Sequence, residues 1–270
     1  MDMKLAGKRA LVSGSSAGIG EGIARMLAGE GSQVVVHGRN VERVEAVAAE
    51  IRSRGGVVAV AIGDLESDEA AAKVARVAVA AFGGIDILVN NAGGRHPTAA
   101  VGWFDLSVQD WLDTYNMNVV SAVRLIHALA KPMQERGWGR IINVSSQAAQ
   151  ATSGQVAEYA AAKAAMSNLT VGLAKTLSKT GVTVNTVSPG MTRTVALEGL
   201  LRSVATREGL GDDVEAGAQF MLTNVMRQTV GRLGIPDDIA FAVAYLASPC
   251  SDFVNGANIR VDGGASPAIN

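Results

Sequence analysis

The feature that most constrains the fold of this 270-residue chain is a regular alternation of short β-branched runs with longer segments of helical period. Apolar runs separated by helices are typical of parallel strands that helices cover on both faces, with right-handed crossovers. The runs expected as strands are Arg9–Ser13, Gln33–His37, Val57–Ile62, Ile85–Asn90, Arg140–Ser145, Val182–Val187 and Asn258–Val261. The segments expected as helices are Ile19–Glu30, Val41–Arg54, Asp68–Phe82, a long helix near Val108–Glu135, the helix that contains Tyr159, and a last one near Pro236–Ala247.

This alternation predicts an α/β fold, a doubly wound parallel sheet with helices on both faces. Hydrophobic residues make up 48% of the chain and glycines number 31, so we expect a sizeable core and many tight backbone sites. No internal repeat or low-complexity linker interrupts the pattern, which favours a single domain over residues 1–270.

Charge and cysteine content exclude several classes of protein. The net charge of -1 gives no basic footprint for nucleic acid or for an anionic membrane. The longest apolar run, Ile239–Ala247, is nine residues, well short of the ~20 that span a bilayer. The single Cys250 cannot form an intrachain disulfide, and Met1–Leu5 lacks the apolar core of a signal peptide. We therefore expect a soluble, cytoplasmic protein. His37 and His127 have no partner at metal-ligand spacing, so no metal site is expected.

Glycines gather in the turn that follows the first expected strand, Gly14–Gly20. They let the backbone turn sharply and approach a pyrophosphate, whose charge is favoured by free amides at a helix N-terminus. The spacing, Gly-x-x-x-Gly-x-Gly, differs from the usual dinucleotide fingerprint, and a plain structural turn is the alternative. Its place at the first strand-to-helix turn favours nucleotide binding by Gly14, Ser15, Ser16, Gly18, Ile19 and Gly20.

The second expected strand ends in Gly38 and Arg39. An acidic residue at this point would accept hydrogen bonds from the ribose of NAD, whereas an arginine can pair with the extra phosphate of NADP. Arg39 is the only positively charged residue that the sequence places at the adenosine end, so we predict NADP(H) as the preferred cofactor. NAD(H) is the alternative if Arg39 is a solvated arginine at a helix start.

The third and fourth expected strands also end in polar residues. Asp64, followed by Leu65, could receive the adenine amino group, or belong to a simple helix N-cap region. The fourth strand ends in Asn90-Asn91-Ala92-Gly93. Amide side chains there can tie neighbouring strand ends together, and the small pair after them lets a cofactor pass close by.

A tyrosine and a lysine four residues apart, Tyr159 and Lys163, share one side of a helix. A nearby cation favours the phenolate, so this tyrosine could exchange a proton with a substrate oxygen near neutral pH. Ser146, at the end of an expected strand, can hydrogen-bond the same oxygen and stabilise charge that develops there. Such a pair is common on solvated helices, and the rest of the chain must decide its meaning.

Taken together, these motifs resemble the classical short-chain dehydrogenase/reductase family. The match covers nearly the whole chain, and its motifs occur in the family's order: the glycine turn, Asp64, Asn90-Asn91-Ala92-Gly93, Asn118, Ser146, Tyr159-x-x-x-Lys163, Pro189-Gly190 and Val261-Asp262-Gly263-Gly264. The resemblance implies a Rossmann-type fold and a nicotinamide-dependent oxidoreductase that interconverts a carbonyl and an alcohol.

The resemblance also assigns roles to individual residues. It implies that Tyr159 is the general acid/base, that Ser146 orients the substrate oxygen, and that Lys163 lowers the tyrosine pKa and binds the nicotinamide ribose. It implies that Asn118 holds a water of a proton relay. The positions matched to cofactor binding include Asn91, Ala92, Gly93, Pro189, Gly190, Thr192 and Thr194.

Some residues depart from the family pattern. Ser13 stands where threonine is frequent and keeps the hydroxyl. Reductases of this family that act on acyl carrier protein carry basic residues at the positions of Gly137 and Thr180, and here Arg136 and Lys179 lie one position away. This departure counts against docking of an acidic carrier protein, and a 3-oxoacyl thioester reductase is kept as the alternative enzyme. An alternative of a different class is a nucleotide-sensing regulator without catalysis, but the catalytic residue types are all retained.

The least typical segment is residues 191–230, where apolar residues recur at helical spacing on both sides of Glu208–Gly211. We expect two amphipathic helices that form a substrate lid, which indicates an apolar substrate if the stripes do more than pack. Met191 is the methionine expected to contact substrate. Arg95 and His96 lie on the expected rim of the site, where a solvated loop is favoured over a contact with a substrate carboxylate.

The resemblance finally implies assembly. Family members commonly form tetramers through the helices near Val108–Glu135 and Tyr159 and through the last strand. The alanine-rich face at Ala160–Ala162 would permit close helix contact. We therefore expect a homo-oligomer, a tetramer, that binds a small-molecule carbonyl or alcohol.

Overall fold

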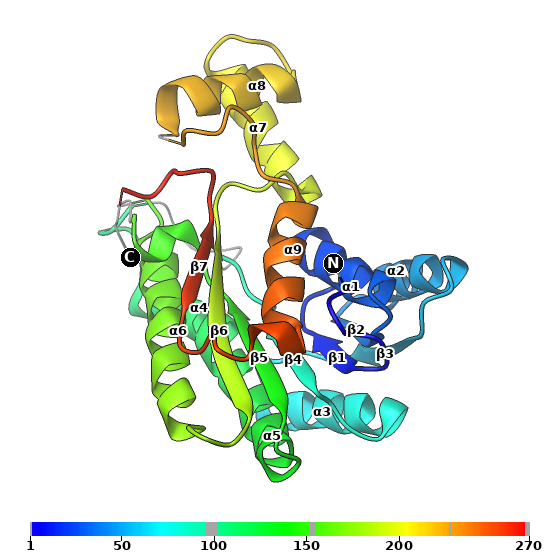
Figure 1. Ribbon diagram of the computed structural model, residues 1–270. Helices are drawn as coiled ribbons and strands as arrows, with labels where there is room; N and C mark the ends of the chain where they lie inside the picture. The colour runs from blue at the N-terminus through cyan, green and yellow to red at the C-terminus, as the bar shows by residue number, and fades with distance from the viewer. Residues whose placement is uncertain (1, 96–101, 152–154, 227, 268–270) are drawn as a thin grey trace.

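A seven-stranded sheet with the order β3-β2-β1-β4-β5-β6-β7 lies at the centre of the protein. The computed structural model describes residues 2–95, 102–151, 155–226 and 228–267, and all of the strand pairs are parallel. The strands are β1 (Arg9–Val12), β2 (Gln33–Gly38), β3 (Val58–Ile62), β4 (Ile87–Asn90), β5 (Gly139–Val144), β6 (Val182–Pro189) and β7 (Asn258–Val261). This is the doubly wound α/β fold that the sequence predicts (Figure 1).

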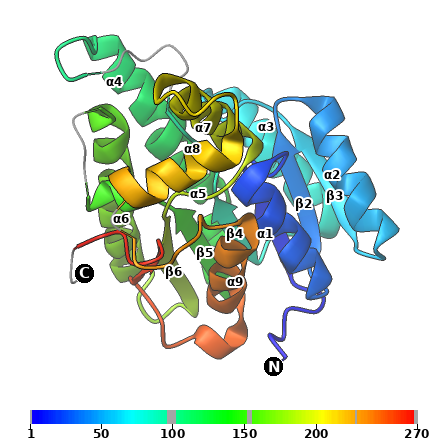
Figure 2. The same cartoon turned by 90° about the horizontal axis from the view of Figure 1, so that it is seen from above.

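Helices cover both faces of the sheet, because alternate residues of each buried strand point to opposite sides. In β1, Ala10 and Val12 join one apolar cluster, whereas Leu11 joins the other. The first cluster contains α1 (Gly18–Gly29), α2 (Val41–Ser53) and α9 (Pro236–Ala247); the second contains α3 (Asp68–Phe82), α5 (Ser121–Glu135) and α6 (Ala157–Thr176). Figure 2 shows α1 and α9 side by side.

The long helix expected near Val108–Glu135 is interrupted. It consists of α4 (Val108–Tyr115), a π-helical turn (Asn116–Val120), here called the π turn, and α5. The predicted long helix is therefore present from Val108 to Glu135, and the π turn within it is a feature that the sequence did not predict. Asn118 is buried in the π turn and its amide donates to the Thr114 carbonyl at 2.8 Å. Such turns widen a helix by one residue per turn and are frequent at functional sites.

The carboxyl ends of β1 and β4 form the point where the strand order reverses. In open α/β sheets, ligands bind in the crevice outside such a point. Asn90, at the end of β4, donates to Asn143 on β5 at 2.8 Å. This bond confirms that the amides tie neighbouring strand ends together.

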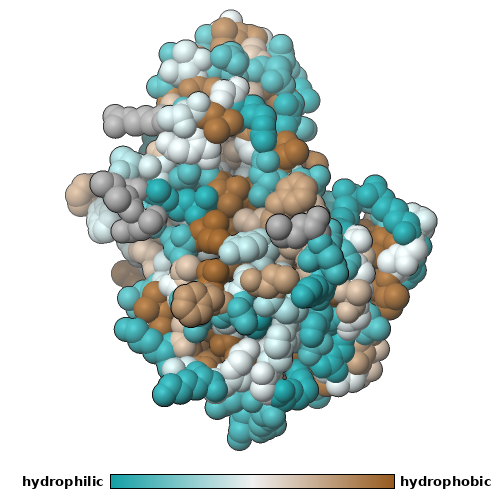
Figure 3. All heavy atoms as spheres, in the orientation of Figure 1, coloured by the Kyte–Doolittle hydropathy of each residue, from teal (hydrophilic) through white to brown (hydrophobic). Residues whose placement is uncertain are grey.

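Two helices project above the carboxyl edge of the sheet, as the sequence predicts for residues 191–230. They are α7 (Val195–Arg207) and α8 (Val214–Phe220), and a second π-helical turn, Met221–Val225, follows α8. Their shared apolar cluster includes Leu201, Val204 and Ala218, so this segment has a small core of its own. Figure 3 shows it as a projection from the body of the molecule.

Candidate active site

The turn between β1 and α1 has the backbone geometry that its glycines suggest. Gly14 and Gly18 have φ values of +63° and +60°, which L side chains rarely adopt. A Cβ at Gly20 would lie 2.3 Å from the Gly14 carbonyl oxygen. Ala17 is the N-cap residue of α1, and among the described residues no side chain forms a capping hydrogen bond at this end of the helix. The first amides of α1 are therefore available to an anion that approaches the turn closely.

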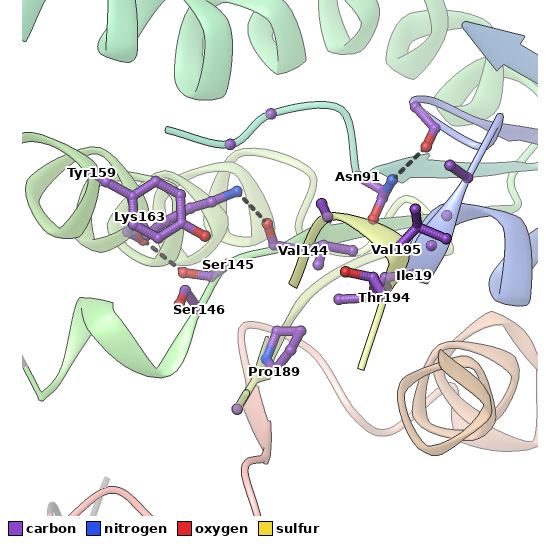
Figure 4. Close-up of a pocket in the computed structure, with 18 residues that line it drawn as sticks. Ile19, Asn91, Val144, Ser145, Ser146, Tyr159, Lys163, Pro189, Thr194 and Val195 are labelled. Atoms are coloured by element: carbon purple, nitrogen blue, oxygen red, sulfur yellow. Dashed lines mark hydrogen bonds between the residues drawn. The ribbon is translucent and has the colours of Figure 1, made fainter. Parts of the chain in front are cut away.

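A cavity of about 320 Å³ extends from this turn to the tyrosine (Figure 4). It brings together residues from the ends of four strands and from three helices of the chain, and so unites most of the predicted site. The predicted residues that line it are Gly14, Gly18, Ile19, Gly20, Asn91, Gly93, Ser146, Tyr159, Lys163, Pro189, Gly190 and Thr194. This is the size and setting of a nucleotide site.

Within this cavity the tyrosine is set up as a proton donor. Removal of the Tyr159 hydroxyl from water raises its pKa above the usual 10.0, and a hydrogen bond with Ser146 opposes this rise. The Ser146 Oγ accepts from the Ala148 amide at 3.1 Å, so its own proton is directed to other partners. In the protein alone, desolvation outweighs this hydrogen bond and favours the protonated phenol, so proton exchange near neutral pH stays a prediction.

Lys163 is buried beneath the tyrosine. Its Nζ donates to the Val144 carbonyl at 2.9 Å and lies 5.7 Å from the centroid of the Tyr159 ring (Figure 4). Burial lowers its pKa to about 8. The ammonium group is held by the end of β5 while it faces the cavity, which leaves a charge close to the tyrosine without direct contact at the phenol.

Asn118 does not line the cavity but borders it. Its amide donates to the Gly94 carbonyl at 2.7 Å, and its Oδ1 accepts from the Gly94 amide at 3.0 Å. A Cβ at Gly93 would lie 2.5 Å from this Oδ1 and 3.4 Å from Lys163 Nζ. The π turn thus presses an asparagine against the backbone that forms the wall of the cavity.

Ser13 fastens the same wall to the glycine turn. Its Oγ accepts from the amides of Asn91 and Ala92, both at 3.0 Å, and donates to the Val89 carbonyl at 3.2 Å. The Asn91 side chain donates to the carbonyls of Ser13 and Gly14 at 3.0 Å each. The Ser13 hydroxyl therefore makes three hydrogen bonds, which account for a hydroxyl-bearing residue at position 13.

A second cavity, of about 190 Å³, adjoins the first at Gly14 and Gly93. The predicted residues that line it are Ser16, Arg39, Asp64, Leu65 and Ala92. Arg43, one turn into α2, lines it as well, so the interpretation of Arg39 as the only cation at this end is wrong. The signal was present in the sequence, because Asn40 is a good N-cap and its side chain accepts from the Arg43 amide at 2.8 Å.

Carboxylates compete for Arg39 in this cavity. Its guanidinium lies 3.5 Å from Asp64 and 3.7 Å from Glu66, and its side chain is 65% exposed. Exposed pairs of this kind are worth little, about 0–1 kcal/mol. The arginine is therefore free to exchange these partners for a stronger anion.

His37 is a residue that the sequence reasoning missed. Its Nδ1 accepts from the Gly14 amide at 3.0 Å, and its Nε2 lies 3.2 Å from the Gly63 carbonyl. Burial lowers its pKa to about 4, so the ring is neutral at pH 7 and donates through Nε2. The His37 ring connects the glycine turn with the end of β3. No local sequence pattern predicts this contact.

Two predicted cofactor residues have their side chains elsewhere. The Ser15 hydroxyl is fully buried, donates to the Val12 carbonyl at 2.7 Å and accepts from the His37 amide. Thr192 is buried and donates to the Gly190 carbonyl at 3.1 Å. Neither side chain lines either cavity. Both shape the backbone of the site instead.

The expectation of a solvated loop at Arg95 is also wrong. The Arg95 Nε donates to Glu158 at 2.7 Å, and the Glu158 side chain is fully buried beside Tyr159 in the sequence. Glu158 was not singled out from the sequence, because an acidic residue in a first helical turn is ordinary. His96 lies outside the described residues.

No group of three His, Cys, Asp or Glu side chains in the described part of the chain is arranged to hold a metal ion. None of the described helices combines the length and the apolar character that crossing a membrane requires.

The sheet, the glycine turn and the shared cavity define a dinucleotide-binding α/β enzyme of the dehydrogenase class. The model of the family described as short chain dehydrogenase matches residues 8–203. The chain belongs to this family.

Similar proteins agree with this assignment. The 7alpha-hydroxysteroid dehydrogenase of Escherichia coli (strain K12) is 35% identical over 100% of this chain and 98% of its own. The 3-oxoacyl-[acyl-carrier-protein] reductase FabG of Vibrio cholerae is 35% identical over 97% of this chain and 98% of its own.

Solved structures agree as well. L-sorbose reductase from Gluconobacter frateurii, complexed with NADPH and L-sorbose, has a TM-score of 0.92 at 29% identity, with both chains fully covered. A 7α-hydroxysteroid dehydrogenase complexed with NADH and 7-oxo glycochenodeoxycholic acid has a TM-score of 0.86 at 34% identity, over 100% of this chain and 98% of that one. The protein is an oxidoreductase that acts on CH–OH or C=O groups, which excludes the non-catalytic regulator.

Proposed function

We propose that this protein is an NADP(H)-preferring oxidoreductase of small carbonyl and alcohol compounds, in which Tyr159 transfers the proton. The observation that carries the proposal is the single cavity that runs from the glycine turn to Ser146, Tyr159 and Lys163. One molecule that reaches both ends must place its anionic part at the turn and its reactive part beside the tyrosine.

The residues present fit a nicotinamide dinucleotide. The close approach of backbone at Gly14 and Gly20 and the available amides of α1 suit a pyrophosphate. Lys163 would bind the nicotinamide ribose. Thr194, which lines the cavity, would hold the cofactor near the amide of its nicotinamide and near its phosphates. When bound, the nicotinamide supplies or accepts the hydride.

The chain's own residues handle the proton. With a raised pKa, Tyr159 is protonated at neutral pH and donates to the substrate oxygen as it gains charge. Ser146 donates a hydrogen bond to the same oxygen, since its Oγ already accepts from Ala148. Lys163 places a positive charge near the phenolate that results. Asn118 holds the backbone of the cavity wall and takes part in the proton relay that reprotonates the tyrosine.

Two arginines support the choice of NADP(H). Arg39 and Arg43 line the cavity at the adenosine end, where a guanidinium pairs well with a ribose phosphate. The complex of L-sorbose reductase with NADPH favours the same choice, whereas the hydroxysteroid dehydrogenase complex contains NADH. NAD(H) is therefore the secondary cofactor.

We further infer one domain over residues 1–270, with residues 191–230 as a lid. Val195 and Ala196, at the start of α7, line the cavity, and Val195 lies beside Ile19 of the glycine turn (Figure 4). A 3-oxoacyl thioester is the second candidate substrate, because FabG of Vibrio cholerae is among the relatives.

For assembly, we propose a cytoplasmic homotetramer. Exposed apolar side chains on α4 and α6 support it: Val108 is 77% exposed, Leu112 58% and Val171 40%. Burial of such side chains in a symmetric helix interface removes apolar surface from water. Light scattering at micromolar concentration tests this, and a mass near the 27.7 kDa of one chain would contradict it.

The test of the reaction is a panel of ketones, keto esters, acyl thioesters, sugars and steroids, assayed with NADPH and with NADH. We expect reduction of at least one simple carbonyl class at a higher kcat/KM with NADPH. Turnover of acyl thioesters alone would favour the second candidate. A protein that binds either nucleotide but turns over nothing in the panel, in either direction, would contradict the proposal.

A further inference from the structure

Glu158 directly precedes Tyr159 in the first turn of α6, and its carboxylate is withdrawn from solvent. The exposed fraction of its side chain is 0%, and that of its partner Arg95 is 28%. The Arg95 Nε donates to Glu158 Oε1 at 2.7 Å. Because a buried carboxylate is costly unless it is paired and hydrogen-bonded, this ion pair is a built part of the fold rather than a solvated surface contact.

The segment 91–95, which carries Arg95, is fastened along its length to the elements around the cavity. Ser13 holds its first amides. Asn118 holds Gly94 through two hydrogen bonds. Arg95 adds the third attachment, to the tyrosine-bearing helix. One short segment therefore links the glycine turn, the π turn and α6. The proposed reaction requires these three parts to keep fixed positions relative to one another.

The start of α6 is packed, with Ala157 and Ala160 buried, but its polar support is limited. Val156 precedes the helix with φ -138° and ψ 40°, and within the described residues no side chain caps the first amides. Uncapped helix ends fray, because their amides lack partners. Glu158 also lies in the positive first turn of the helix, where a carboxylate is favoured. Its ion pair thus anchors the turn in which Tyr159 lies.

We propose that the Arg95–Glu158 ion pair positions Tyr159. It holds the first turn of α6 against the Gly93–Gly94 wall of the cavity, so that the phenol stays at a fixed distance from the reacting oxygen. Neither residue touches the reacting atoms; both act through the tyrosine. The inference rests on the proposed role of Tyr159 and adds two positioning residues to it.

The experiment compares Glu158→Ala, Arg95→Ala, the double variant and the conservative Glu158→Gln, with NADPH and the best carbonyl substrate of the panel. We expect each alanine variant to lower kcat about tenfold or more, because small misplacements of a catalytic group are costly. The KM for NADPH should change less than about threefold, since the glycine turn and the adenosine end are untouched. Glu158→Gln, which keeps an acceptor for Arg95, should recover most of kcat.

The double variant separates a positioning pair from two independent residues. If the pair acts as a unit, removal of both partners lowers kcat no more than the worse single change. It also removes the uncompensated buried carboxylate that Arg95→Ala alone would leave, so it is expected to fold better than that single variant.

A matched control is the pair Arg9–Asp86, at the opposite end of the sheet. Its Nε–Oδ2 distance is also 2.7 Å, and both of its side chains are mostly buried. Arg9→Ala should lower the melting temperature and leave kcat unchanged. Unchanged kcat in Glu158→Ala and Arg95→Ala, or losses that multiply in the double variant, would overturn the inference. If Tyr159→Phe also left the rate unchanged, the proposed function itself would have failed.

Discussion

Lys163 lies 5.7 Å from the centre of the Tyr159 ring and donates its hydrogen bond to the Val144 carbonyl rather than to the phenol. The lysine is therefore close to the tyrosine ring but bonded to the end of β5. Burial dominates both pKa values, because it raises that of the tyrosine and lowers that of the lysine to about 8. The protein alone presents a protonated phenol beside a weakened cation.

The tyrosine is the first residue to test. Tyr159→Phe removes the proton donor and keeps the ring, so we expect turnover to fall by ~10²-fold or more. Affinity for NADPH should be retained, because the ring and the glycine turn remain. Steady-state kinetics and fluorescence titration of the nucleotide measure the two effects. An unchanged rate with a confirmed carbonyl substrate would show that another group transfers the proton.

The arginines at the adenosine end should set the choice of cofactor. Arg39→Ala and Arg43→Ala each remove a guanidinium that can face the ribose phosphate, and we expect NADPH affinity to fall about tenfold per change. NADH affinity should stay nearly constant, because NADH has no phosphate there. Arg54→Ala is the matched control, since Arg54 caps the far end of α2 and pairs with Glu50. Equal affinities for both cofactors in the unmodified protein would contradict the assignment.

His37 should make the free energy of unfolding depend on pH. Its pKa is lowered from 6.5 to about 4, so the unfolded chain binds a proton over this interval while the folded protein does not. The contribution is lost as pH falls from 6.5 to 4, by about 3 kcal/mol in all. His37→Asn retains an acceptor for the Gly14 amide but does not titrate. Urea unfolding at several pH values should show the difference between the two proteins narrowing in acid, and a constant difference would contradict the buried neutral ring.

Two glycines should respond in opposite ways to alanine. Gly93 has φ +150°, and a Cβ there would meet Asn118 Oδ1 at 2.5 Å, so Gly93→Ala should destabilise the fold by ~2 kcal/mol or more and reduce activity. Gly172, inside α6, has nothing within 4 Å of an added Cβ. Gly172→Ala should stabilise the protein by ~0.5–1 kcal/mol. Thermal unfolding of both variants checks the pair, and similar shifts in both would count against the packing described at Gly93.

The sequence by itself determined the order of strands and helices and most of the cavity lining. Strand residues 34–36 and 141–142 can be recognised in the sequence because burial on both faces requires unbroken apolar runs. The carboxyl ends of such strands meet at one edge in any parallel sheet. Gly14 and Tyr159 could therefore be placed in one site before any coordinates. Their motifs are local, and local patterns are what a sequence displays.

Only the tertiary structure decided the contacts between distant segments and the free energies that depend on burial. Glu158 became an anchor because Arg95, 63 positions earlier, reaches it. The π turn places the Asn118 side chain where it binds both the Thr114 carbonyl and the backbone of Gly94. The direction of the Tyr159 pKa followed from desolvation, which exceeds the opposing effect of the hydrogen bond with Ser146. Desolvation is a property of the whole packed chain, and no spacing in the sequence measures it.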